Sequence, residues 1–200
     1  MIALIRKVDS GKWNKHMDKY VSDKEIAPYP ITNDMKTCKD NTLSVWEVDM
    51  SNRDEFEKVI LAIASIRERI QNLDLAIIRR DDIRDKGYII DDFPGESRID
   101  KYNDFHRNLK DLRMDQVISL SEDIILSLKN KVANNVDIIK LINDDGKIKE
   151  PKVIRIREKQ LLEMFIKRIE DHEFSEDVLG EKFRKQINMH IEKLNKRNVN

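Results

Sequence analysis

Carboxylates gather near the ends of the strands that the sequence predicts, and they are the first residues to weigh for chemistry. Glu47 and Asp49 alternate along one predicted strand and therefore point to the same face of it. A divalent-metal nuclease would need two or three such carboxylates with a lysine such as Lys101 nearby. Their spacing matches no nuclease pattern, however, and carboxylates in turns are usually solvated. Further carboxylates crowd the turns around neighbouring strands: Asp81, Asp82, Asp91, Asp92, Glu96 and Asp100.

Cations cluster in the last quarter of the chain. Over residues 181–200, lysines and arginines outnumber the glutamates. One interpretation is a set of phosphate contacts along a nucleic-acid backbone. The other is a solvated helix face whose cations complement the negative end of the last helix. The candidate nucleic-acid-binding residues are Arg155, Arg157, Lys182, Arg184 and Lys185.

Several other chemistries have little support. No two of the four histidines are three or four residues apart, so a metal site built on them would require a tertiary coincidence. Cys38 lies near Lys36 and Lys39, which would favour a thiolate, yet a lone cysteine usually packs as a small hydrophobe. The five glycines are solitary, and neither a G-x-S-x-G turn nor a phosphate-binding glycine loop occurs. We therefore predict no catalytic residue, no bound metal and no cofactor.

Charge and length limit the class of protein. The chain has 200 residues with 38 basic and 38 acidic side chains, so any binding to nucleic acid must come from local patches. One cysteine permits neither an intrachain disulfide nor a cysteine zinc cluster. The apolar run at residues 2–5 is too short for a signal peptide, and no stretch approaches the roughly 18 apolar residues of a membrane span. We expect a cytoplasmic protein that is not bound to a membrane.

The elements that must position these residues begin with strands. Short apolar or alternating runs predict strands at residues 2–7, 42–49, 73–78 and 88–91. Pro28 and Pro30 predict that the chain before the second strand is an irregular connection or carries a short helix near Trp13 to Tyr20. A long helix begins after Ser51 or Asn52 and carries a stripe of apolar residues three and four apart, which ends at Ile70.

Helices dominate the remainder of the chain. Apolar spacing predicts helices at residues 100–113, 115–130 and just after 134–135, followed by a break at 147–151. A short alternating strand and a helix then occupy residues 153–169, and the last helix starts after Ser175. The predicted fold is α+β: a small mixed sheet with a long packed helix in residues 1–113, then a helical region, residues 114–200, which packs on it or extends to a partner.

The late helices carry apolar stripes that need cover. Our preferred hypothesis is a non-catalytic accessory or interaction subunit of a protein complex, as a homo- or hetero-oligomer. The alternative is a nucleic-acid-binding protein or a metal-dependent nuclease. A composition rich in Lys, Ile, Asp and Asn adds a prokaryotic defence or toxin–antitoxin setting to both hypotheses. The candidate interface residues are Tyr29, Phe165, Ile169, Phe183, Ile187 and Ile191.

Overall fold

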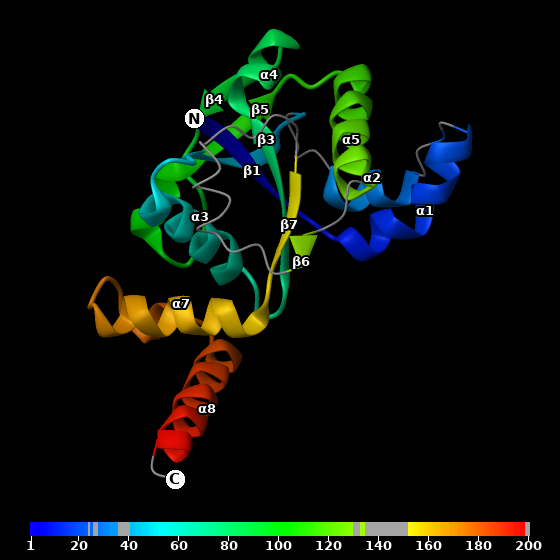
Figure 1. Cartoon of the computed structure of the whole chain (residues 1–200). Helices are drawn as coiled ribbons and strands as arrows, with labels where there is room; N and C mark the ends of the chain where they lie inside the picture. The colour runs from blue at the N-terminus through cyan, green and yellow to red at the C-terminus, as the bar shows by residue number, and fades with distance from the viewer. Residues whose placement is uncertain (24, 26–27, 36–40, 130–132, 135–151, 199–200) are drawn as a thin grey trace.

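A largely antiparallel sheet organises the chain (Figure 1). The computed structural model describes residues 1–23, 25, 28–35, 41–129, 133–134 and 152–198. The strand order is β4-β5-β2-β1-β3-β7-β6, and every neighbouring pair is antiparallel except β6 and β7. The strands are β1 (Ile2–Val8), β2 (Leu43–Asp49), β3 (Leu73–Arg79), β4 (Ile89–Asp92), β5 (His106–Lys110), β6 (Ala133–Asn134) and β7 (Lys152–Ile156).

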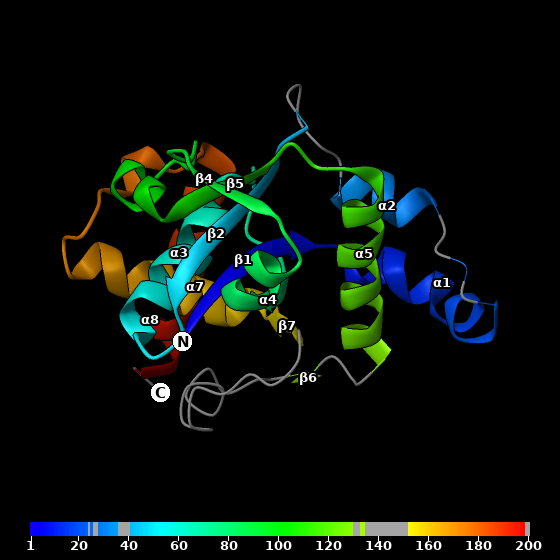
Figure 2. The ribbon, with the colours of Figure 1, turned by 90° about the horizontal axis from the view of Figure 1, so that it is seen from above.

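Helices cover both faces of this sheet (Figure 2). On one face, α3, α7 and α8 enclose a core with the apolar side chains of β1, β2, β3 and β7. On the other face, α1, α4 and α5 enclose a second core. The predicted α+β class is therefore confirmed. The helices are α1 (Ser10–Asp23), α2 (Pro28–Asp34), α3 (Arg53–Ser65), α4 (Arg80–Asp85), α5 (Met114–Lys129), α7 (Glu158–Glu170) and α8 (Glu181–Asn198), with the 3₁₀ turns η1 (Asp100–Phe105) and η2 (Glu176–Val178).

The start of α3 follows from its sequence. The side chain of Asn52 accepts hydrogen bonds from the backbone N–H groups of Asp54 and Glu55, at 3.1 and 3.3 Å. The side-chain carboxylates of Asp54 and Glu55 also lie in the first turn of the helix, where they complement the positive helix end. The helix ends at Ser65, before the predicted stripe does, and Ile66 is 52% exposed in the turn that follows. The segment after α3 therefore leaves the helical layer and turns toward the end of the sheet.

The two late helices complete the first core. Phe165 of α7 and Phe183 of α8 are fully buried, and their rings meet edge to face with centroids 4.7 Å apart. Ile187, one turn beyond Phe183, is also buried, while Ile169 and Ile191 are partly buried against the same core. Phe165, Phe183 and Ile187, which were predicted to face a partner, thus pack inside the chain itself, because the sheet needs a helical cover on this face.

One buried cation ties α7 to α3. Arg168 contacts Asp54 at 2.7 Å and Glu57 at 3.1 Å, and it also pairs with Glu173, which accepts a hydrogen bond from the Tyr102 hydroxyl. Burial alone would lower the pKa of Arg168, but the bonds to Glu173 and Asp54 outweigh this effect and raise it. Three carboxylates around one guanidinium hold the helices in register.

Residues 100–113 were predicted to form a helix, and this prediction is wrong. The structure has the short turn η1 and then strand β5, in which Leu109 faces the second core and His106 and Asn108 share the opposite face. The prediction that Pro28 lies in irregular chain is also wrong. Helix α2 begins at Pro28, because a proline is tolerated in the first turn of a helix. Ser175 caps η2, and α8 starts only at Glu181. The predicted short helix after residues 134–135 and the break at 147–151 lie outside the described residues.

Both halves of the chain build a single sheet. β7, from the region predicted to pack on the first domain or extend to a partner, pairs with β3 over the register Leu73↔Ile156 to Ile77↔Lys152. Helix α5 packs on β7 and α1. Residue 113 therefore does not separate the sheet from a purely helical region.

The burial of the α7 and α8 stripe predicts a stability effect. Phe165→Ala and Phe183→Ala should each lower the free energy of unfolding by about 3–5 kcal/mol, because each removes a buried aromatic ring and leaves a cavity. Met189→Ala, at a position that is 53% exposed on α8, should change it by less than about 0.5 kcal/mol. Urea unfolding of the three variants measures this. Phenylalanine variants as stable as the parent would contradict the packing described here.

Candidate functional site

A cavity of about 720 Å³ opens at the end of the sheet where β1 and β7 end and β3 begins. Its walls come from β1, the start of α1, the end of α2 and the segment that follows α3. We call it the cationic cavity because lysines and arginines make up much of its lining. The lining residues are Lys7, Val8, Asp9, Lys12, Asn33, Asp34, Arg67, Glu68, Arg69, Gln71, Asn72, Asp74 and Arg155.

A paired carboxylate and guanidinium form one wall of the cationic cavity. Asp74 and Arg155 are directly opposite each other on β3 and β7, and Arg155 donates to both carboxylate oxygens at 2.6 and 2.9 Å. Ser10, at the start of α1, donates its hydroxyl to Asp74 at 2.5 Å and accepts from Arg155 at 2.8 Å. Burial would raise the pKa of Asp74, but the bonds from Arg155 and Ser10 outweigh burial and lower it. Asp74 is therefore a fixed anion whose charge is already balanced.

The other carboxylates of the cationic cavity are also engaged. Asp34 accepts from the backbone N–H of Asp9 and from the indole N–H of Trp13, both at 2.6 Å. Asp9 pairs with Lys12 at 3.4 Å. Glu68 pairs with Lys182 of α8 at 2.9 Å. Each carboxylate of the lining thus has donors of its own.

Three cations of the lining have no such partner. Among the described residues, no carboxylate lies within ion-pair distance of Lys7, Arg67 or Arg69. Arg67 donates through one terminal nitrogen to the carbonyls of Gln71 and Asn72 and shows no bond from its other nitrogens within the described chain. Desolvation at the cavity wall lowers the pKa of both Lys7 and Arg67, and Arg67 lowers that of Lys7 further by repulsion, although nearby carboxylates of the lining act in the opposite direction on each. Two cations that repel each other at a hollow surface create a place where an anion would be stabilised.

The residues predicted to bind nucleic acid lie in different parts of the structure. Arg155 lines the cationic cavity, and Arg157 follows it at the start of α7 as an exposed side chain. The α8 cations pair with carboxylates instead: Lys182 with Glu68, Arg184 with Asp177 and Lys185 with Glu181. The positive charge at the start of α8 is therefore balanced by carboxylates.

The predicted acidic residues are spread over several places, although Glu47 and Asp92 both pair with Arg107. Glu47 pairs with Arg80 and Arg107. The Asp49 carboxylate accepts hydrogen bonds from the backbone N–H and hydroxyl of Ser51 and from the N-terminal ammonium. These bonds lower the pKa of Asp49 to about 2. Each carboxylate thus serves a local salt bridge or turn. Within the described part of the chain, no three His, Cys, Asp or Glu side chains are arranged to hold a metal ion.

Three further residues singled out in the sequence are Asp92, Lys101 and Tyr29. Asp92, the edge carboxylate of β4, pairs with Arg107 at 2.9 Å. Lys101 lies away from the strand carboxylates, beside Glu173 and over the ring of Tyr102. Tyr29 lies in α2, but its side chain is outside the described part of the structure.

No family model, curated protein or solved structure matches this chain. In the described residues, no helix combines the length and apolar character needed to cross a membrane. Function must therefore be argued from the geometry of the chain itself.

Lys7 and Arg67 were missed in the sequence because each looks ordinary locally. Lys7 ends an alternating strand, and Arg67 lies in a charged turn after a helix. The one available signal was their position, since each lies two or three residues after a buried apolar run and so at the margin of the core. Only the folded sheet shows that these two margins meet.

The Asp74 and Arg155 pair predicts a pH-dependent stability. Asp74→Asn should lower the free energy of unfolding at pH 7 by about 2 kcal/mol, because the half-buried Arg155 loses its counter-ion. Since folding lowers the pKa of Asp74, its contribution is present above the unfolded value of about 4 and is lost as pH falls through the folded value. The difference between parent and variant should therefore shrink below about pH 4.

The control for this prediction is Asp115→Asn. Asp115 also pairs with an arginine, Arg113, and this pairing lowers its pKa, but both side chains are solvent-exposed. Urea unfolding at a series of pH values should separate the two variants. Equal losses for both would show that the cross-strand pair has no special role.

Proposed function

We propose that this protein binds a small phosphate-bearing ligand, of the size of a nucleotide, in the cationic cavity. The single observation that carries the proposal is the pair of cations, Lys7 and Arg67, which face the cavity without a carboxylate partner among the described residues. A guanidinium with free N–H groups next to an ammonium is the donor set that phosphate oxygens favour.

The volume and the charge balance indicate a small ligand. A cavity of about 720 Å³ falls within the roughly 300–1,000 Å³ of small-molecule sites. A nucleic-acid backbone would need a longer row of available cations. Three α8 cations that could extend such a row, Lys182, Arg184 and Lys185, are paired with Glu68, Asp177 and Glu181. A single phosphate or diphosphate group therefore fits the charges better than a long strand.

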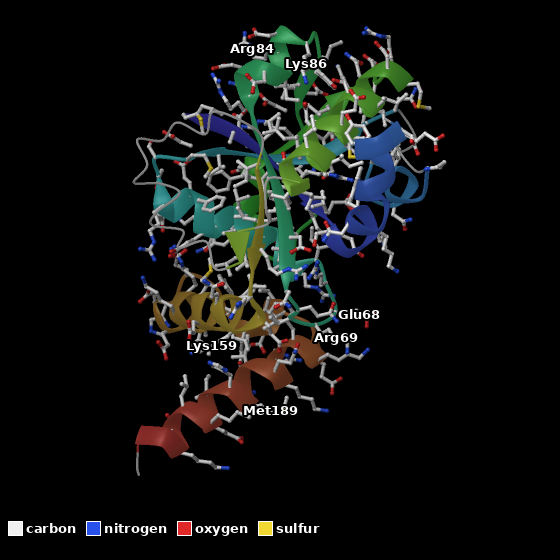
Figure 3. All side chains as sticks on the ribbon, turned by 45° about the vertical axis from the view of Figure 1, so that its right-hand side comes forward. Glu68, Arg69, Arg84, Lys86, Lys159 and Met189 are labelled. Atoms are coloured by element: carbon white, nitrogen blue, oxygen red, sulfur yellow. The ribbon has the colours of Figure 1, made fainter. Side chains whose placement is uncertain are left out.

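Titration calorimetry with ADP and with inorganic pyrophosphate tests the proposal. We expect saturable binding that Lys7→Gln and Arg67→Gln each weaken about 10–100-fold, since a charge-assisted hydrogen bond contributes about 1.5–3 kcal/mol. The matched control is Arg84→Gln. Arg84 is exposed and lies at the top of the molecule in Figure 3, well apart from Glu68 and Arg69.

Two results would overturn this proposal. One is the absence of saturable binding at low salt, or equal affinity for the parent and the two cavity variants. The other is tight binding of a single-stranded oligonucleotide, with a steep dependence on salt and no competition from ADP. That second result would favour nucleic-acid binding, the broader alternative, over a small ligand.

A second candidate function, an accessory subunit of a protein complex, is favoured by the outer part of α8. The helix projects from the body (Figure 1), and its apolar stripe continues beyond the buried residues Phe183 and Ile187 to Ile191 and Leu194. Leu194 is 37% exposed, and Lys193 precedes it. A stripe that continues past its own core at helical spacing suits a helix-in-groove contact. This basic neighbour favours a different protein with an apolar groove and an acidic rim over a second copy of this chain.

Leu194→Asp tests the accessory-subunit candidate without disturbing the core. Affinity purification from the source cells should retain a stoichiometric protein with the parent chain and lose it with Leu194→Asp, because a carboxylate would enter the groove. Light scattering of the purified complex gives the stoichiometry. A monomer that retains nothing, or a partner retained equally by Leu194→Asp, would contradict this function.

A further inference from the structure

A second cavity, of about 600 Å³, lies beyond the end of α3 on the edge half of the sheet. We call it the Ser44 cavity. Its walls come from β2, β5, the segment Phe93–Glu96 that follows β4, and Ile66 just after α3. Its lining combines aromatic and aliphatic groups with a serine, a histidine and an asparagine. The lining residues are Thr42, Ser44, Trp46, Ile66, Asp91, Phe93, Pro94, Gly95, Glu96, His106, Asn108, Lys110 and Asp111.

Ser44 and His106 form a polarised pair in this cavity. The Ser44 hydroxyl lies 2.5 Å from Nε2 of His106, and Nδ1 of the same ring lies 2.8 Å from the backbone carbonyl of Phe93. A carbonyl can only accept, so Nδ1 carries the proton of the neutral ring and Nε2 is the acceptor. The Ser44 hydroxyl therefore donates to Nε2. This is the arrangement in which a histidine acts as a base toward a serine nucleophile while a third group fixes its tautomer.

The surrounding side chains fix His106 in this orientation. The ring packs edge to face against Trp46, with ring centroids 5.1 Å apart. It also meets the Phe93 ring edge to face, with centroids 6.4 Å apart. Gly95 brings the loop onto the histidine, because a Cβ at that position would lie 2.9 Å from the Trp46 ring and 3.0 Å from Cβ of His106. His106 is only 7% exposed, while Ser44 is half-buried and faces the cavity. The base is thus shielded and the hydroxyl is accessible.

A donor for a developing oxyanion lies across from the serine. Asn108 pairs directly with Ser44 in the β2–β5 register, so both side chains project from the same face of the sheet. Asn108 also lines the cavity, and within the described chain its side chain has no hydrogen-bond partner. An amide N–H₂ in this position suits the stabilisation of a tetrahedral intermediate.

We propose that the Ser44 cavity is an esterase site, in which Ser44 is the nucleophile, His106 the general base and Asn108 the oxyanion donor. Ser44 Oγ attacks the ester carbonyl and its proton passes to Nε2 of His106. The bond from the carbonyl carbon to the alkoxy oxygen then breaks, and the departing alcohol takes that proton. Water attacks the acyl-serine, again with His106 as base, and releases the acid and the free Ser44 hydroxyl.

The charges of the lining indicate the substrate class. Among the described residues of the lining, Asp91, Glu96 and Asp111 are present with a single cation, Lys110, which pairs with Asp91 at 3.7 Å. The excess of carboxylates disfavours an anionic substrate. Trp46, Ile66 and Phe93 provide an apolar wall. A small uncharged carboxylic ester fits this lining, in contrast to the phosphate ligand of the cationic cavity.

An alkyl fluorophosphonate is the first probe, because it phosphonylates an activated serine and releases fluoride. Mass spectrometry of the intact chain should show one adduct, located on the peptide that contains Ser44, and hydrolysis of p-nitrophenyl acetate should show the same dependence on Ser44. Ser44→Ala should abolish the adduct. His106→Gln should slow labelling at least about 100-fold, as expected for loss of a general base. Ser119→Ala is the matched control, since Ser119 is also half-buried but lies on α5.

The pH profile of the parent chain separates a catalytic from a structural pair. Burial lowers the pKa of His106, opposed by the Phe93 carbonyl and Glu96 and reinforced by Arg107 and Arg6. The labelling rate should therefore rise with pH through a single pKa below about 6.5 and then level off. No adduct on the folded parent chain, equal labelling of Ser44→Ala, or a rate without this titration would overturn the esterase proposal, even if His106→Gln fails to fold.

Discussion

The burial of β1 and β3 on both faces is the constraint on which the rest of the structure depends. β3 is buried along nearly its whole length, and β1 alternates between the two cores. A sheet that is apolar on both faces requires a helical layer on each side. The chain before residue 100 supplies α3 for one face and α1 with α4 for the other. The second half must complete both layers, and it does so with α5, α7 and α8 while adding β7 to the sheet.

Both cavities form where this helical cover stops. The segment that follows α3 contributes Ile66 to the Ser44 cavity and Arg67 to the cationic cavity. At such margins the sheet still presents side chains, but no helix covers them, so polar residues can project into a hollow held by rigid strands. Lys7 and Ser44 occupy these margins on β1 and β2. The geometry of each site is therefore set by strands that the core already fixes.

Buried ion pairs connect the layers and set the charge pattern of the surface. Arg168 joins α7 to α3, and Arg155 joins β7 to β3 and, through Ser10, to α1. Each of these cations pairs with a carboxylate, whereas Lys7 and Arg67 have none within ion-pair distance among the described residues, although the carboxylates of the lining still attract them. In a chain with as many acidic as basic side chains, a local absence of counter-ions carries more information than the net charge.

The sequence by itself determined the elements whose signals are local. Apolar alternation located β1, β2 and β3, and the Asn52 cap with its helical stripe located the start of α3, because strand and helix periodicity and capping act within a few residues. Only the tertiary structure decided which helices cover which face of the sheet. The apolar stripe of α7 and α8 reads the same whether it faces a partner or a sheet, and residues 106–110 became a strand because β2 offered a free edge. The pairs Lys7 with Arg67 and Ser44 with His106 join residues 60 or more positions apart, and only the closed sheet brings such residues together.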